Sequence, residues 1–195
     1  MRILGKSFVA SLALALLQGL VPRESVATES AAESAVQHFR ILGLSEPDRV
    51  EDLRHVFEAT PGLTLESADF EKEEISVRIH PEIFQGKDKP GADPEALLKR
   101  LNQLVGQASR STFKLAPRSA VPGDKLQKIE IAVGLLDCKG CRFGAYRAVA
   151  YLDGVERVKV STLSMSVCAW VDPGKISRDA LVAALKKARV EMPAE

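Results

Sequence analysis

The sequence has little of several features that mark large classes of protein. It contains three cysteines in 195 residues, so it is not a disulfide-stapled scaffold, and its fold must depend on apolar burial. Its formal net charge is only +1, aromatic residues make up 5%, and no basic stripe with interleaved aromatic side chains is present. We therefore expect no nucleic-acid partner.

Catalytic motifs are also missing from the sequence. There is no Ser-His-Asp set, no glycine loop that would cradle a phosphate, and no pair of carboxylates spaced for acid–base catalysis. We expect a protein that is not an enzyme. With 46% hydrophobic and 27% charged residues, the chain has the composition of a folded protein and the length for one large domain or two small ones.

The longest apolar run lies at the N-terminus. Arg2 and Lys6 precede an apolar run over residues 8–21, and residues 25–27 (Ser-Val-Ala) supply the small side chains of a cleavage site. This pattern predicts a secretory signal peptide over residues 1–27, with a retained N-terminal anchor helix as the alternative. The run is short for a membrane span and no second one follows, so we expect no stable membrane anchor. The predicted location is periplasmic or secreted.

The C-terminal part of the sequence has the pattern of a βαββαβ unit. Apolar residues alternate over residues 125–135 and follow helical spacing over residues 142–152, and a turn is expected at Asp153-Gly154. Two more strands, a helix capped by Ser177 and a short edge strand at residues 190–192 complete the pattern. This order is that of the ferredoxin-like fold.

The N-terminal part repeats this order, and Gly62 occupies the turn position that Gly154 has later, which indicates an internal duplication. We predict an α+β protein of two ferredoxin-like βαββαβ sandwiches in tandem, following the signal peptide. The predicted parts are a degenerate domain without cysteines over residues 38–116, a linker over residues 117–126, and a domain with two cysteines over residues 127–192.

Two cysteines form a C-x-x-C pair at the point where a strand pattern ends and a helix pattern begins. Cys138 and Cys141 can converge on one soft ion there, and the positive end of the helix dipole stabilises their thiolate forms. In an oxidising compartment, the pair can instead close as a disulfide. The N-terminal part has Ser-Glu-Pro-Asp at the corresponding residues 45–48 and cannot form a thiolate site.

Residues 127–192 resemble the heavy-metal-associated (HMA) domain, the family of copper chaperones, periplasmic mercury-binding proteins and N-terminal modules of metal-pumping P-type ATPases. The residues that carry the resemblance are Cys138-x-x-Cys141, Gly154-Val155, Val158, Val160, Val171-Asp172-Pro173 and the helical pattern over 181–188. Residues 38–116 resemble the same fold only through element order and the Gly62 turn. The resemblance implies a soluble metallochaperone that passes its ion to a metal transporter or another metal-binding domain.

The residues around the pair leave the identity of the metal open. Asp137 is similar to the residue of the zinc and cadmium subset of the family, and two thiolates with a carboxylate suit a divalent ion. Two thiolates alone suit Cu(I), and the positive charges of Lys139 and Arg142 favour such a complex. We predict Cys138, Cys141 and Asp137 as metal ligands for one heavy-metal ion, with Cu(I) or Zn(II) expected and Hg(II) or Cd(II) as alternatives.

The remaining candidate residues have more ordinary interpretations. Cys168 and Trp170 fall on one face of a predicted strand, where we expect Cys168 to pack and Trp170 to mark a contact surface. The three histidines lie on different elements without ligand spacing. The acidic run at residues 71–74 is expected to be a solvated hairpin turn.

Two other functions stay open for the same chain. A C-x-x-C pair at a helix N-terminus also lowers a thiol pKa, so the pair could serve thiol–disulfide exchange, although the element order is not that of thioredoxin. The third possibility is a protein-interaction module of HMA fold in which metal binding is lost. The fold by itself does not choose among these functions.

Overall fold

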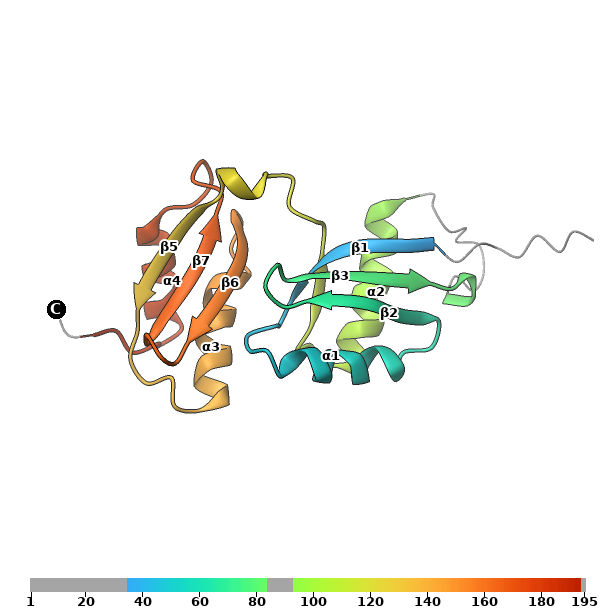
Figure 1. Ribbon diagram of the computed structural model, residues 1–195, viewed down its shortest axis with the longest axis horizontal. Coiled ribbons are helices and arrows are strands. Elements are labelled where there is room, and N and C mark those ends of the chain that lie inside the picture. Colours follow the sequence, from blue (N-terminus) through green and yellow to red (C-terminus); the bar gives the residue numbers. More distant parts are fainter. Residues whose placement is uncertain (1–34, 84–92, 194–195) are drawn as a thin grey trace, which may run out of the picture. The chain divides into compact units, whose positions relative to one another are not determined.

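The computed structural model describes residues 35–83 and 93–193. They form a mixed α+β structure with two antiparallel sheets and four α-helices (Figure 1). The predicted signal peptide lies outside the described residues. Within residues 35–83 and 93–193, no helix combines the length and the apolar character needed to cross a bilayer.

The N-terminal half, residues 35–116, has the predicted order of strands and helices. Its elements are β1 (Ala35–Leu42), α1 (Arg49–Glu58), β2 (Leu63–Asp69), β3 (Glu74–Ile79), a short 3-10 helix (Pro81–Ile83), α2 (Pro94–Ala108) and β4 (Lys114–Ala116). The strands lie in the order β2-β3-β1-β4 with every neighbouring pair antiparallel. This arrangement is consistent with a ferredoxin-like fold.

The C-terminal half, residues 127–193, has a sheet of three strands. Its elements are β5 (Gln127–Ala132), α3 (Lys139–Ala150), β6 (Val155–Ser161), β7 (Ser166–Val171) and α4 (Arg178–Lys187), and a short 3-10 helix (Gly123–Lys125) precedes them. The strand order is β5-β7-β6, again antiparallel. In Figure 1 the helices of each half lie against one face of that half's sheet.

The prediction of an edge strand at residues 190–192 is wrong. α4 ends in a turn in which Arg189 has a positive φ of 60° and the N–H of Val190 donates to the carbonyl of Leu185. Gly134 then donates one backbone hydrogen bond to Glu191 at 2.7 Å. Pro193 is the next residue after this segment and has no N–H to continue a ladder, so residues 190–192 stay irregular.

Each half has a hydrophobic core between its sheet and its helices. The core of the N-terminal half contains Phe39, Ile41, Leu44, Leu53, Phe57, Val77, Leu101, Val105 and Leu115, and that of the C-terminal half contains Ile131, Leu136, Tyr146, Val149, Val158, Val167, Leu181 and Leu185. Leu42, the last residue of β1, packs into the core of the C-terminal half. Apolar contact therefore joins the first strand to the second sheet.

The repeated turn predicted from Gly62 and Gly154 is present in both halves. The two glycines have positive φ values of 80° and 85°, a backbone conformation that favours glycine. The carbonyl of Gly62 accepts a hydrogen bond at 2.9 Å from the N–H of His80, the residue after β3. The carbonyl of Gly154 accepts one at 2.7 Å from the N–H of Asp172, the residue after β7. The two halves therefore share the backbone geometry of this turn.

Candidate functional site

The cysteine pair lies where β5 leads into α3. The helix begins at Lys139, earlier than the apolar spacing predicted, so Cys138 is the N-cap residue and Cys141 lies in the first turn. Leu136 is 1% exposed and belongs to the C-terminal core, which anchors the loop from beneath. Both cysteines are exposed, and both sit at the positive end of the α3 dipole.

In the structure, Cys138 and Cys141 are joined as a disulfide, with their Cα atoms 5.1 Å apart. The Sγ atom of Cys138 accepts a hydrogen bond from the backbone N–H of Cys141 at 2.9 Å, in the manner of a serine or aspartate N-cap. After reduction, this N–H would stabilise a thiolate on Cys138. The geometry therefore suits two kinds of chemistry, disulfide exchange and the binding of a thiophilic ion.

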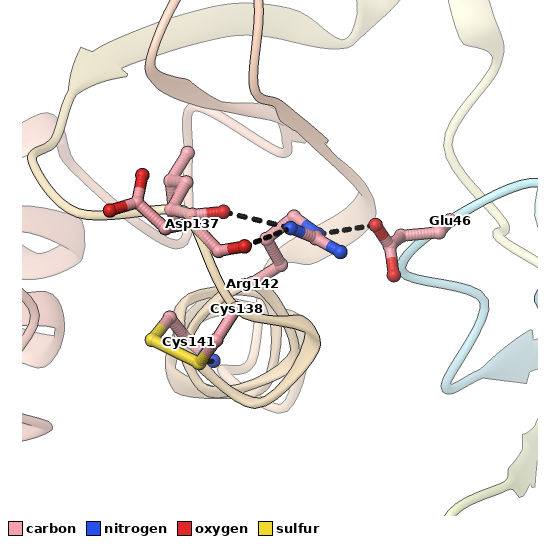
Figure 2. The surroundings of a disulfide bond; sticks show 6 residues. Glu46, Asp137, Cys138, Cys141 and Arg142 are labelled. Carbon is pink, nitrogen blue, oxygen red and sulfur yellow. Dashed lines mark hydrogen bonds and ion pairs between the residues drawn. A yellow bond between two sulfur atoms is a disulfide. The ribbon is translucent and has the colours of Figure 1, made fainter.

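Asp137, the third predicted ligand, does not face the cysteine pair. Its carboxylate points away from the two sulfur atoms in Figure 2. Among the described residues, no three His, Cys, Asp or Glu side chains form a group that could hold a metal ion. The structure thus brings together two of the three predicted ligands, Cys138 and Cys141, and leaves the role of Asp137 a prediction.

Arg142 occupies a central position beside the pair. Its Nη1 atom donates to the carbonyl oxygens of Leu136 at 2.9 Å and Asp137 at 3.1 Å, the two carbonyls directly before Cys138. Its Nε atom donates to the carboxylate of Glu46, which comes from the loop between β1 and α1 (Figure 2). The Arg142 and Glu46 side chains are 14% and 17% exposed, so the ion pair is largely screened from water.

Lys139, which lies between the cysteines, makes a second ion pair with the same loop. Its Nζ atom donates to Asp48 at 2.7 Å, and both side chains are exposed. This hydrogen bond holds the pKa of the Asp48 carboxyl below its usual range and raises the pKa of Lys139. Both cations beside the cysteines are therefore matched by carboxylates from the N-terminal half.

The contacts of Glu46 and Asp48 do not follow from the sequence pattern. There, these residues only mark the absence of cysteines at residues 45–48, and the charges of Lys139 and Arg142 only favour a Cu(I) complex. The structure pairs these two carboxylates with the two cations beside the cysteines. Neither pairing follows from an alignment of the two loops, because the partners lie far apart in the sequence.

Glu73, in the turn between β2 and β3, is fully buried, so the prediction of a solvated turn is wrong at this residue. Its Oε1 atom accepts a hydrogen bond from the N–H of Val158 on β6 at 3.3 Å. Its Oε2 atom has no hydrogen-bond partner among the described residues. The buried side chain of Glu73 therefore accepts a hydrogen bond from β6, an edge strand of the sheet in the other half.

Burial and the nearby positive charges have opposite effects on the pKa of Glu73. Burial raises the pKa of Glu73 to about 7, while the positive charges of Lys159 and Arg40 act in the lowering direction. Burial also lowers the pKa of Lys159, whose ammonium donates to the carbonyl of Phe70 and lies 3.3 Å from the centre of its ring. The cluster therefore contains a carboxyl group that changes charge near neutral pH.

Arg40 and Tyr146 complete this buried polar cluster. The guanidinium of Arg40 donates to the carbonyls of Val155 at 2.6 Å and Ala150 at 3.3 Å, and the Tyr146 hydroxyl accepts from the N–H of Gly43 at 3.0 Å. Burial raises the pKa of Tyr146 well above its ordinary value. Because Glu73, Arg40 and Tyr146 are all buried, we assign the cluster a structural role and not a substrate-binding one.

The other residues singled out from the sequence are dispersed. Cys168 is free and 9% exposed, and burial raises the pKa of its thiol, in agreement with the predicted packing role. The ring of Trp170 is covered by the guanidinium of Arg157 at 4.0 Å from its centroid. The histidines contact serine, threonine or glutamate side chains and do not gather with each other in the described part of the chain.

No protein-family model and no curated protein matches this chain. Among solved structures, two of the soluble N-terminal region of the P-type ATPase CopA from Bacillus subtilis are similar, each at 13% identity with a TM-score of 0.32. Each alignment covers 82% of this chain, with 89% of one CopA structure and 93% of the other. These values by themselves assign no function to the chain.

Proposed function

We propose that this protein is an exported, non-enzymatic metal-binding protein in which reduced Cys138 and Cys141 bind one soft metal ion and pass it to a partner. The observation that carries the proposal is the placement of two exposed sulfur atoms, one on the N-cap and one on the first turn of α3. The anchoring of Leu136 in the core fixes the loop that carries them.

The donor set favours Cu(I) as the cargo. Two sulfur atoms without a third ligand suit a two-coordinate ion, and soft thiolates prefer Cu(I) among the metals of the first row. Zn(II) requires about four ligands, and no group of three or more His, Cys, Asp or Glu among the described residues is arranged to hold a metal ion. Hg(II) shares the preference for sulfur, and a second protein would have to complete a site for Zn(II) or Cd(II).

Exposure of the pair also supports transfer to a partner. A metal transporter or another metal-binding domain could bring its thiols to the ion while Cys138 and Cys141 still hold it, through three-coordinate intermediates. Such ligand exchange requires an open approach, which the exposed positions of both cysteines and of Gly140 provide. The proposed export to the periplasm or the extracellular space places this exchange outside the cytoplasm.

The test is an anaerobic titration of the reduced protein with Cu(I), Zn(II) and Hg(II) against competing chelators, with native mass spectrometry for the stoichiometry. We expect one ion per chain, with Cu(I) held far more tightly than Zn(II). A double substitution of Cys138→Ser and Cys141→Ser removes this binding. Cys168→Ser is the matched control, because it removes the one other cysteine and should leave binding unchanged.

Three results would contradict the proposal. They are no tight binding by the reduced protein, binding that survives the double substitution, and binding that is lost in Cys168→Ser. Asp137→Asn tests the remaining predicted ligand. It should leave Cu(I) affinity unchanged if the carboxylate stays away from the sulfurs, and a large loss would show that Asp137 turns toward the ion.

The disulfide in the structure favours a second candidate function, thiol–disulfide exchange. In that reaction a substrate dithiol would give two electrons and two protons to the pair, yielding a substrate disulfide and two cysteine thiols. This function predicts rapid equilibration with a peptide dithiol in the absence of metal. Slow exchange together with tight Cu(I) binding would leave the metal-binding function standing alone.

A further inference from the structure

The N-terminal half contacts the cysteine loop through the carboxylate of Glu46, which is not among the core residues of that half. Glu46 is only 17% exposed, yet its bonded partner is Arg142, which lies 96 positions away in the sequence and directly after Cys141. Among the described residues, the second carboxylate oxygen of Glu46 has no hydrogen-bond partner. The burial of this carboxylate is therefore compensated almost wholly by Arg142.

Arg142 transmits this contact to the backbone of the cysteine loop. One nitrogen of its guanidinium donates to the carbonyls of residues 136 and 137, while another donates to Glu46. A guanidinium is planar and its donors have fixed directions, so a carboxylate at one nitrogen determines where the others point. Glu46 thus orients the group that holds the two peptide units before Cys138.

We propose that Glu46 is a positioning residue for the cysteine pair, so that the cysteine-free half acts as a clamp on the loop of the other half. In the reduced protein, the clamp keeps the two thiols near the 5.1 Å Cα separation of the disulfide form. Its loss lets the loop spread and also leaves the positive charge of Arg142 unmatched near the sulfurs. Both effects make the reduced form more favourable relative to the disulfide.

The inference rests on the proposed role of the cysteine pair, but its test needs no metal. The full chain is equilibrated with mixtures of reduced and oxidised dithiothreitol, and the disulfide fraction is read by mass after trapping of the thiols. In this reaction, dithiothreitol gives two electrons and two protons to the disulfide, forming two protein thiols and the cyclic disulfide of the reagent. Failure of Cu(I) binding would leave this measurement intact.

Glu46→Gln should shift the equilibrium toward the reduced form by about fivefold to tenfold, since it weakens a charge-assisted hydrogen bond. Glu66→Gln is the matched control. It removes a carboxylate that bonds Arg78 within the first half at 2.6 Å, and it should change the equilibrium less than about twofold. An equal shift in both variants, no shift in Glu46→Gln, or a shift toward the disulfide would overturn the proposal.

A double-mutant cycle separates positioning from a general charge effect. In an Arg142→Met background, Glu46→Gln should have no further effect on the equilibrium, because Arg142 carries the coupling. Independent, additive effects would show that Glu46 acts only through its charge. If Arg142→Met does not fold, Arg142→Lys replaces it, since a lysine keeps the cation but lacks the planar fork that reaches Glu46 and both carbonyls.

Discussion

Replacing Glu73 by glutamine removes a buried titrating group while nearly preserving its shape. The side chain is fully buried, accepts a hydrogen bond from the Val158 N–H, and is faced by Lys159 from β6, Arg40 from β1 and Tyr146 from α3. Burial raises the pKa of this carboxyl from its ordinary 4.5 to about 7. The folded protein therefore keeps a proton that the unfolded chain releases more than two pH units earlier.

The sign and the size of the effect follow from this difference. Between pH 4.5 and about 7, the unfolded chain binds fewer protons at this position than the folded chain, so the free energy of unfolding falls as the pH rises. At about 1.4 kcal/mol for each pKa unit, the difference corresponds to a loss of about 3 kcal/mol, complete once the pH exceeds about 7. Glutamine resembles the protonated acid and does not titrate, so Glu73→Gln should lack this loss.

Urea unfolding of both proteins at several values between about pH 5 and about pH 8 measures the effect, because their difference cancels the titrating groups that Glu73 does not influence. Tryptophan fluorescence and far-ultraviolet circular dichroism report the transition, with the disulfide kept oxidised throughout. We expect similar stabilities at the acidic end and a variant more stable by about 3 kcal/mol at the alkaline end. A wild type at least as stable as the variant at about pH 8 would refute the reasoning, since it would mean that the ionised carboxylate is well compensated by Lys159 and Arg40.

Three further substitutions test the contacts that support the fold. Arg40→Met should lower the free energy of unfolding by about 2–4 kcal/mol in urea, because the carbonyls of Val155 and Ala150 lose their donor; a loss below about 0.5 kcal/mol would contradict this. Tyr146→Phe keeps the ring but removes the acceptor for the Gly43 N–H, and we expect a loss of about 1–2 kcal/mol in the same assay. Gly154→Ala should lower the melting temperature, because φ is 85° and a Cβ would lie 2.7 Å from the Cβ of Lys175, at a cost of about 1–3 kcal/mol. Gly144→Ala is its control and should be neutral or stabilising, since a Cβ there meets nothing within 4 Å.

The order of helices and strands could be predicted because each element buries one face against its own sheet or helices. Ile129 and Ile131 on β5 alternate with exposed residues, and Leu181 and Leu185 on α4 recur at helical spacing, so local periodicity records the core. The failure at residues 190–192 has a different origin. Those residues satisfy an apolar pattern, but the turn at Arg189 and the missing N–H of Pro193 decide their conformation.

Local sequence patterns predicted only part of the candidate site. Cys138 and Cys141 are close in the sequence, so their spacing and the start of a helix sufficed to bring them together. Glu46 and Arg142 are 96 positions apart, and Glu73 and Val158 are 85 apart. No periodic pattern encodes such contacts, because they depend on how one sheet edge and one loop of each half come to face the other half. A fully buried glutamate in an acidic run is therefore invisible to local sequence analysis.

Contacts between the two halves include two ion pairs at the cysteine loop and a buried carboxylate beside β6, so they respond to salt and to pH. Salt screens the exposed Lys139–Asp48 pair far more than the Arg142–Glu46 pair, which is largely buried. Rising pH adds a negative charge at Glu73, beside the edge of β6. The N-terminal half, which has no cysteine, thus supplies the carboxylates that pair with Lys139 and Arg142 in the cysteine loop.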